Sequence, residues 1–448
     1  MVRSCSRLED QTAKNPDLYN HMEDWPPYTY RDYPDVTPEN FRSFLNFLGT
    51  ENTSRLVMEL QAWISFCDSK CTFCYFSNEI FRKEIIDEYL LALKKELKMY
   101  AETKYIRSSE FDEVVLGGGS PTVLSSDQLV DLISYCEKNF NVTENRMVKV
   151  TGCTHNFDEK KLKSVVDYAK NARCVQADLG VQTFDDGIRK MLNIQDSASD
   201  AERMIRNARK FGLYVCIDLM YNLPGQTVEV FRDDVKKALE LDAEGVDCYS
   251  LEVIPGTPLA KQIQFGKVPP IGDADVAMKM YLEAYDLFEK AGYKPTGHSR
   301  FSRVMEHFKE NCVRGWPWSG ILTTGAGCFM GYLGKYSYEN IEAASSYIDM
   351  VNREMLPLGK LSVSSEEDDM RKVMMRLYIR QPVSKQRFQK QFGKSPEEVF
   401  PATIKRLKEK GLIEVDDEEI RLTKKGDVWR YNIAWEFGPK SKVCSDTI

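Results

Sequence analysis

The chain has 448 residues, 42% of them hydrophobic, which is enough to build one large domain and a smaller one around separate cores. Its formal net charge of −7 argues against nucleic-acid binding as its main function. The sequence shows neither a secretory signal pattern nor a regular disulfide framework for its 12 cysteines, so we expect a reducing compartment, the cytoplasm. It contains no run of about 18 apolar residues, so we expect no membrane span.

The first part of the chain predicts an arm followed by an α/β domain. Residues 1–54 are rich in aromatic residues and proline, which indicates an extended arm that packs on the next domain. The strands expected after it cover residues 55–63, 114–116, 147–150, 175–181, 214–221 and 247–253. The expected helices cover residues 83–103, 126–139, 158–170, 199–211 and 228–241. This alternation predicts a parallel sheet with crossover helices, and ligands of such folds bind at the carboxyl ends of the strands.

The pattern changes near residue 364. Residues 301–363 are expected to complete the first domain and to connect it to the second. The elements expected beyond them are helices over 366–379, 385–392 and 396–410, a hairpin over 413–422 and a last helix from 424. This order predicts a winged-helix-like α+β domain over residues 364–448. Many such folds bind DNA, but a fold does not fix a function, and we interpret the basic stretch 385–394 as a solvated or partner-binding face.

Three cysteines share one short loop after the first strand: Cys67, Cys71 and Cys74. Soft thiolates favour iron-sulfur clusters or zinc, and a closed zinc site needs a fourth ligand. The nearest downstream candidates lack the spacing of a zinc knuckle: Cys136, Cys153 and His155. A 4Fe–4S cluster with one open iron needs only three cysteines, and the open iron can bind a substrate or cofactor. We therefore favour a cluster, with structural zinc and simple core packing of the thiols as alternatives.

The spacing Cys-x3-Cys-x-aromatic-Cys, with Phe73 as the aromatic residue, resembles the signature of the radical S-adenosylmethionine (SAM) superfamily. Residues 117–122, GGGSPT, resemble the GGGTPT segment of its HemN-like branch, named for coproporphyrinogen III dehydrogenase. Residues 178–184 and 217–227 resemble the GVQ(S/T)F and DLIYGLPGQT segments of the same branch. The resemblance covers residues 56 to 300 and implies a partial TIM-type (β/α) barrel, whose mouth is covered by a C-terminal domain of the kind predicted above.

The resemblance also implies the cofactors and the residues that bind them. Cys67, Cys71 and Cys74 would ligate three irons of a 4Fe–4S cluster, and SAM would chelate the fourth iron. The implied contacts to one or two SAM molecules come from Phe73, Gly118, Gly119, Ser120, Gln182 and Asp218. Phe73 would lie near adenine, the Gly118 segment near the methionine end or a second SAM, and Gln182 and Asp218 near the sugar. A low-potential flavodoxin or ferredoxin would reduce the cluster, and no residue that acts on the substrate is implied.

The sequence also departs from the family pattern. Residues 61–66, QAWISF, replace the usual Tyr-x-His-Ile-Pro-Phe before the first cysteine. The family usually holds the methionine part of SAM with a Glu after the third strand and an Arg after the GVQ strand. Residues 151–156, TGCTHN, and 192–195, LNIQ, contain neither charge. Loss of both charges is less damaging than loss of one, because no unpaired buried charge is left. Even so, we do not expect ordinary coproporphyrinogen decarboxylation, and we expect the substrate, the SAM geometry or both to have diverged.

The predicted function is radical methyl transfer to, or ring modification of, a tetrapyrrole or another planar unsaturated substrate. Within the branch, the chain is most similar in character to the heme-degrading and methyl-transferring members. The alternatives are a non-catalytic heme carrier and an oxygen-independent coproporphyrinogen III dehydrogenase. His298, which lies beside Arg300 at a late strand, is a further candidate functional residue.

Overall fold

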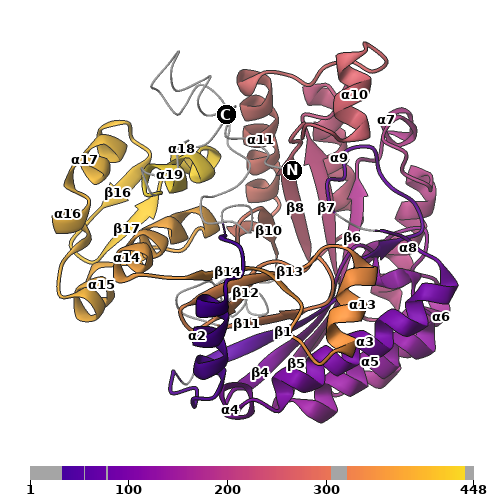
Figure 1. Ribbon diagram of the computed structural model, residues 1–448. Coiled ribbons are helices and arrows are strands. Elements are labelled where there is room, and N and C mark those ends of the chain that lie inside the picture. The colour runs from indigo at the N-terminus through magenta and orange to yellow at the C-terminus, as the bar shows by residue number, and fades with distance from the viewer. Residues whose placement is uncertain (1–32, 55, 77–78, 304–319, 439–448) are drawn as a thin grey trace.

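The computed structural model describes residues 33–54, 56–76, 79–303 and 320–438 (Figure 1). Most of the predicted N-terminal arm, residues 1–32, lies outside these ranges. The described part of the arm forms helix α2 (Pro38–Leu48), which begins at a capping box made by Thr37 and Asn40. Its buried Phe44 packs on Tyr336 and Tyr338, with ring centroids 5.2 Å and 5.8 Å away. This segment therefore packs against a late part of the sheet.

A single twelve-stranded sheet forms the large domain. Its central strands run parallel: β1 (Val57–Ile64), β4 (Glu110–Gly118), β5 (Val142–Cys153), β6 (Cys174–Gln182), β7 (Tyr214–Tyr221), β8 (Gly245–Ser250) and β11 (Ile321–Thr324). Antiparallel strands extend both sides: β9 (Lys294–Thr296) and β10 (Arg300–Ser302) on one, and β12 (Gly331–Leu333), β13 (Tyr336–Asn340) and β14 (Leu358–Val363) on the other. Among the described strands, β9 and β14 are the two edges, so the barrel is open. The prediction of a partial barrel is confirmed.

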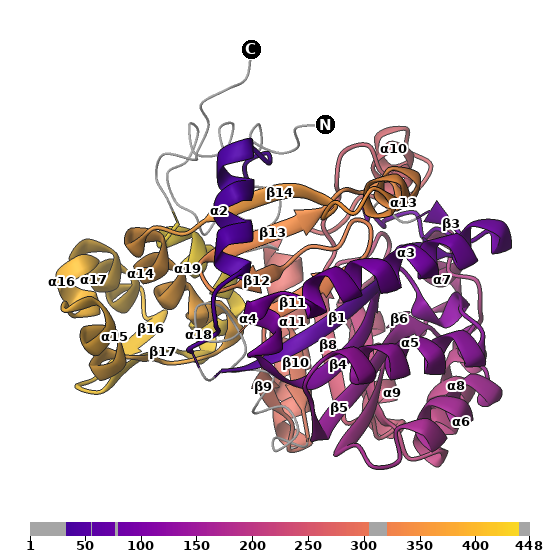
Figure 2. The same cartoon turned by 60° about the horizontal axis from the view of Figure 1, so that its bottom comes forward.

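Helices cover the outer face of this sheet, as Figures 1 and 2 show. They are α3 (Lys83–Ala101), α5 (Ser126–Asn139), α6 (Glu159–Tyr168), α8 (Ala198–Lys210), α9 (Val228–Glu240) and α11 (Ala274–Lys290). Five of the six begin at a side chain that accepts a hydrogen bond from the first turn: Ser125, Asp158, Ser197, Thr227 and Asp273. Shorter elements lie between them: β2 (Phe66–Cys67), β3 (Glu79–Ile80), α4 (Lys104–Arg107), a 3-10 turn (Pro121–Val123), α7 (Asp186–Met191), α10 (Pro258–Gln264) and α13 (Ala344–Asn352). No described helix is long and apolar enough to cross a membrane.

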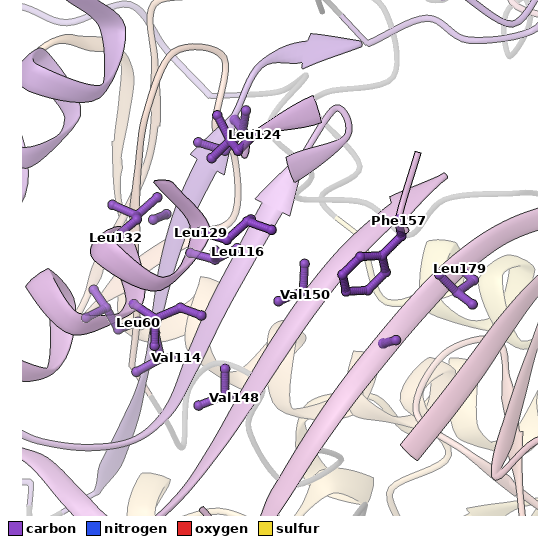
Figure 3. Close-up of a cluster of buried hydrophobic side chains, with 14 of the residues drawn as sticks. Leu60, Val114, Leu116, Leu124, Leu129, Leu132, Val148, Val150, Phe157 and Leu179 are labelled. Carbon is purple, nitrogen blue, oxygen red and sulfur yellow. The ribbon is translucent and has the colours of Figure 1, made fainter. Parts of the chain in front are cut away.

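The two faces of the parallel strands differ in chemistry because successive side chains point to opposite faces. Figure 3 shows the outer, apolar face, which α5 covers with Leu129 and Leu132. The strand residues on that face are Leu60, Val114, Leu116, Val148, Val150 and Leu179. The alternate positions are polar: Gln61, Glu113, Lys149 and Asp178. The barrel therefore has an apolar outer layer under the helices and a polar interior.

The C-terminal domain has its own core. Its elements are α14 (Glu366–Met375), a 3-10 turn (Arg376–Ile379), β15 (Val383–Ser384), α15 (Lys385–Phe392), α16 (Pro396–Val399), α17 (Pro401–Glu409), β16 (Ile413–Val415), β17 (Glu419–Leu422), α18 (Lys424–Val428) and α19 (Arg430–Glu436). The short strands form the sheet β15–β17–β16. A separate apolar cluster that includes Phe388, Leu407 and Ile433 fills the space between helices and sheet. The winged-helix-like α+β prediction is confirmed, although the expected last helix is divided in two at Trp429.

A buried ion pair within this domain, Arg380 with Asp427, makes hydrogen bonds to the barrel. Arg380 donates from Nε to Asp427 at 2.7 Å, and Tyr281 of α11 donates its hydroxyl to the same carboxylate at 2.5 Å. The other end of the guanidinium donates to the backbone carbonyls of Thr296 and Arg300, each at 3.1 Å. Arg380 itself has φ +60°, a backbone conformation that is uncommon for a residue other than glycine. Such a conformation persists where surrounding contacts fix it, and here both domains supply them.

Candidate cluster and cofactor site

The cysteine loop lies at the carboxyl ends of the parallel strands, where its backbone is held from two sides. Cys67 ends β2, which pairs in parallel with β3. Thr72 donates its N–H to the carbonyl of Leu192 and accepts from the N–H of Leu259, both at 2.9 Å. Asn193 donates its side-chain amide to the carbonyl of Lys70 at 2.9 Å. The chain segments after β6 and β8 therefore fix the loop that carries the three thiols.

The three thiols of the loop are partly buried and close enough to influence one another. Burial, followed by the nearby thiols, raises the pKa of Cys67 well above its usual range and that of Cys71 to about 12. Burial also raises the pKa of Cys74. Metal binding must therefore displace protons from this loop. Within the described residues, no three His, Cys, Asp or Glu side chains converge on one metal ion, but a cuboidal cluster holds each thiolate on a different iron and does not need such convergence.

Two buried hydroxyls beside the loop support the fit of a bound group. Thr72 lies between the second and third cysteines, and Thr154 follows the end of β5. The Oγ1 atoms of both residues are buried and have no hydrogen-bond partner within the described part of the chain. Buried polar atoms are normally paired, so unpaired ones call for an explanation, and a bound group is one. Thr72 belongs to the loop itself, so the three thiols and its hydroxyl fit a cluster that carries a polar cofactor.

The glycine segment at the end of β4 fixes the start of the cysteine loop. Gly118 has φ +105°, and a Cβ added there would lie 2.9 Å from the backbone nitrogen of Ile64. Gly119 donates its N–H to the carbonyl of Ile64, and Ser120 donates its N–H to that of Phe66, both at 2.8 Å. The Ser120 hydroxyl is buried and bonds to Thr122 at 2.9 Å. The glycines thus permit a close backbone approach that positions Cys67.

The end of β5 contacts the cysteine loop through His155, near the position where the family usually has a Glu. The Nε2 atom of His155 lies 2.8 Å from the Asp68 carboxylate, and Asn156 donates to the same carboxylate at 3.1 Å. The hydrogen bond from His155 is the largest effect that lowers the pKa of Asp68. Cys153 lies four positions after Lys149 on β5, so the two side chains point to the same interior face.

The nearest arginine after the GVQ strand is fully engaged in structure. Arg189 donates to the carbonyls of Val181 and Thr183 at 2.8 Å and 2.9 Å and pairs with Asp196 at 2.5 Å. It is almost completely buried, so its guanidinium holds the turn after β6 together. The absence of both family charges from residues 151–156 and 192–195 therefore is not offset by Arg189.

Gln182 and Asp218 lie side by side on the interior face. Gly180 pairs in register with Asp218, and a Cβ added to Gly180 would lie 2.9 Å from Nε2 of Gln182. The Gln182 side chain thus folds back over Gly180, which its φ of +68° permits. Burial, followed by the negative charges of Asp247 and Asp178, raises the pKa of Asp218 well above its usual range. Neither side chain makes a hydrogen bond within the described residues, so a neutral Asp218 can donate one to a ligand.

Phe73 lies on an apolar cluster at the same end of the barrel. The buried members of this cluster are Ile188, Leu192, Met220, Leu223, Leu251 and Leu259. Tyr249 of β8 packs on the same cluster. The structure therefore brings the three cysteines, Phe73, the Gly118 segment, Gln182 and Asp218 to one end of the barrel, as expected of a shared site.

An ion network below this site was not predicted from the sequence. Asp178 of β6 pairs with Lys149 at 3.1 Å and with Arg300 at 3.3 Å. Arg300 also pairs with Asp247 at 2.5 Å, and Ser299 donates its hydroxyl to Asp247 at 2.9 Å. In the sequence, the only signal for this network is the polar residues at alternate positions of otherwise apolar strands. The strands are predicted from their short apolar runs, so these polar positions do not stand out as a network. Burial raises the pKa of Asp218 most, Asp247 and Asp178 of the network add to it, and Arg300 and Lys149 oppose it.

Asp178 predicts a pH dependence of stability. Burial alone would raise the pKa of this carboxyl, but Lys149 and Arg300 outweigh burial and lower it to about 2. In an unfolded chain the pKa is about 3.9, so the stabilisation is complete above about pH 5 and is lost as the pH falls toward 2. Between pH 6 and pH 3, we expect the free energy of unfolding of Asp178→Asn, measured with urea, to fall by about 1 kcal/mol less than that of the wild type. Equal losses in the two proteins would contradict this assignment.

Two family profiles match the chain, one in each of its two domains. The Radical SAM superfamily profile matches residues 63–238, which contain the cysteine loop, the Gly118 segment, Gln182 and Asp218. The profile of the HemN C-terminal domain matches residues 363–429. Both matches agree with the resemblance of the motifs to the HemN-like branch of the radical SAM superfamily.

Relatives of known identity cover most of the chain. It is 29% identical to heme chaperone HemW of Bacillus subtilis over 81% of this chain and 94% of the relative. It is 25% identical to anaerobilin synthase of Escherichia coli O157:H7, over 83% of this chain and 81% of that protein. Among solved structures, coproporphyrinogen III oxidase (HemN) of Escherichia coli has the same fold, with a TM-score of 0.79 at 20% identity over 93% of this chain and 96% of that one.

Proposed function

We propose that this chain is a radical SAM enzyme that modifies the ring of a heme-type tetrapyrrole, or another planar unsaturated substrate, or transfers a methyl group to it. The observation that carries the proposal is the position of the three-cysteine loop beside the Gly118 segment, Gln182 and Asp218 at one end of an open barrel. When bound and reduced, the cluster supplies one electron for the reductive cleavage of SAM. The expected electron donor is a low-potential flavodoxin or ferredoxin, and the expected location is the cytoplasm.

The residues of the site have distinct proposed roles. Cys67, Cys71 and Cys74 hold three irons, while SAM occupies the fourth. Gln182 and the protonated Asp218 offer hydrogen-bond donors to the sugar of SAM, and Phe73 offers an apolar face to adenine. The Gly118 segment keeps side chains away from the methionine end. With neither a Glu nor an Arg to hold that end, the methionine group depends on the open iron and on neutral donors.

The substrate class is supported by the relatives and by aromatic residues on the interior side of β1. The relatives include a heme chaperone, anaerobilin synthase and coproporphyrinogen III oxidase, whose names refer to heme or tetrapyrrole chemistry. Trp63 contacts Phe329 at a ring-centroid distance of 4.7 Å, and Phe329 stacks on Phe76 at 5.6 Å. Planar substrates stack well on such rings.

Two other functions remain as second candidates because of the same relatives. A heme carrier, like the chaperones by name, would bind heme without turnover of SAM. An oxygen-independent coproporphyrinogen III dehydrogenase would cleave SAM but would release carbon dioxide from its substrate. Product analysis separates the three functions.

The test is anaerobic reconstitution with iron and sulfide, reduction with dithionite, and incubation with SAM in the presence and absence of heme. We expect formation of 5′-deoxyadenosine, stimulated by heme. S-adenosylhomocysteine in addition would indicate methyl transfer and the use of a second SAM molecule. Stoichiometric heme binding without either product would overturn the enzyme proposal and leave the carrier.

A further inference from the structure

We propose that Nε2 of His298 is the axial ligand that holds the iron of a heme-type tetrapyrrole in this protein. This inference rests on the proposed function, since it concerns how the same substrate is held. His298 is a partly buried residue in the turn between β9 and β10. It is separate from the cysteine loop and from the predicted SAM contacts.

The fold places His298 on the interior side of the barrel, near the cofactor site. Arg300, two residues later, pairs in antiparallel register with Asp247 of β8, and their side chains form an ion pair in the interior. Tyr249 lies two positions beyond Asp247 and so on the same face of β8. The ring of His298 contacts the ring of Tyr249 at a centroid distance of 5.8 Å. Tyr249 packs on the apolar cluster that also holds Phe73, so His298 lies one ring away from that cluster.

The hydrogen bonds of His298 are compatible with the tautomer that carries its proton on Nδ1. Its Nδ1 lies 3.2 Å from the hydroxyl of Tyr431, and that hydroxyl donates to the His298 carbonyl at 3.4 Å. A tyrosine hydroxyl has a single proton, so once that proton goes to the carbonyl the oxygen accepts from Nδ1–H. Nε2 then carries the lone pair. A histidine whose other ring nitrogen is fixed by a hydrogen bond is the usual form of a metal ligand.

The charges around His298 favour the neutral ring that metal binding needs. Burial is the largest effect, and the cations Arg430, Arg300 and Arg380 add to it against the opposing charge of Asp247, so that the pKa of His298 falls to about 4. Arg430 also fixes the backbone here, since its Nε donates to the His298 carbonyl at 2.5 Å. Nε2 has no hydrogen-bond partner within the described residues. The available lone pair is therefore not used by the protein itself.

The surroundings favour a heme iron over a free metal ion. A free transition-metal ion needs several protein ligands, and within the described residues no three His, Cys, Asp or Glu side chains converge to hold one. A heme iron already has four nitrogen ligands from its macrocycle and needs only one axial ligand from the protein. Tyr249 contacts the imidazole ring and the hydroxyl of Tyr431 lies at its Nδ1, so two aromatic side chains adjoin the proposed ligand.

The test compares ferric protoporphyrin IX iron (hemin) with metal-free protoporphyrin IX, titrated into the cluster-reconstituted wild type and His298→Ala under anaerobic conditions. We expect His298→Ala to weaken hemin binding by about tenfold or more and to change the ferric electron paramagnetic resonance spectrum, while metal-free protoporphyrin binds as before. Added imidazole should restore the wild-type spectrum. Arg421→Ala is the control and should leave the hemin spectrum unchanged, because Arg421 is exposed on the hairpin of β16 and β17.

Tyr431→Phe keeps the imidazole and tests the tautomer argument separately. We expect it to retain hemin but to shift its spectrum, because Nδ1 loses its acceptor. An unchanged hemin affinity and spectrum in His298→Ala, with both macrocycles still bound, would overturn the ligand assignment and leave the proposed function intact. A wild-type protein that binds neither macrocycle would overturn the ligand assignment and the tetrapyrrole form of the proposed function, and would leave radical SAM chemistry on another planar substrate.

Discussion

Replacing Cys71 by serine is expected to remove the cluster and to abolish SAM cleavage. Cys71 is partly buried in the middle of the loop, and a serine hydroxyl is a much harder ligand than a thiolate. We expect the bound iron to fall from about four per chain to near zero, because the cluster then lacks one of its three thiolate ligands. Formation of 5′-deoxyadenosine should fall by more than about 100-fold. Substitution of residues that only support metal ligands already lowers activity by about 10–100-fold, and removal of a ligand should cost more. Iron and sulfide analysis with chromatographic product analysis measures both quantities.

Cys136→Ala provides the matched control for this substitution. Cys136 is a fully buried cysteine on α5 that packs in the main apolar core. Its loss should lower stability by about 1 kcal/mol, through the cavity left behind, while iron content and turnover stay at the wild-type level. Full iron content and normal SAM cleavage in Cys71→Ser would contradict the role of the loop.

Replacing Asp427 by alanine is expected to cause the largest loss of stability outside the main core. The carboxylate pairs with Arg380 at 2.7 Å and accepts the hydroxyl of Tyr281 at 2.5 Å, and both partners are buried. Its removal leaves the Arg380 guanidinium buried without its counter-charge, which typically costs about 3–5 kcal/mol. Because Arg380 also binds the carbonyls of Thr296 and Arg300, the loss should loosen the contact between the two domains. Urea unfolding and hydrogen exchange of residues 294–302 measure the two effects.

Arg421→Ala is the control for charge removal within the same domain. Arg421 forms ion pairs with Glu414 and Asp416 on the hairpin of β16 and β17, where all three side chains are exposed. Exposed pairs contribute about 0–1 kcal/mol, so this variant should unfold close to the wild type. Equal stability losses in Asp427→Ala and Arg421→Ala would contradict the interdomain role of Asp427.

The sequence predicted the order of the elements better than the length of the strands. The helix beginnings agree within one or two residues, because capping residues such as Ser125 and Asp158 mark them. Strand β4 begins at Glu110 and β5 at Val142, both before the apolar runs that indicated them. The added residues include interior-facing or exposed polar side chains, which do not look like strand residues in a sequence. Only the completed barrel gives them partners.

Those parts of the site that lie in a local sequence motif could be predicted from the sequence. The cysteine loop, the Gly118 segment, Gln182 and Asp218 all lie at one end of the barrel, and their contacts with cofactors remain predictions. The pairing of Lys149 with Asp178 and of Arg300 with Asp247 depends on register between strands far apart in the chain. The contact of His298 with Tyr431 joins residues 133 positions apart. None of these contacts has a local signature, because the ion pairs depend on strand pairing within the barrel and the contact of His298 depends on the docking of two domains.

The dependence of His298 on α19 has a consequence for how the protein matures. The cysteine loop is synthesised early, whereas Tyr431 and Arg430, which fix the imidazole, belong to the last described helix. Domains fold largely as units during synthesis, from the N-terminal side. We therefore expect the nascent chain to acquire iron and sulfide on the ribosome before it gains the orientation of His298. Iron-55 labelling of chains stalled before Ser365 would show this order, and label that enters only released chains would contradict it.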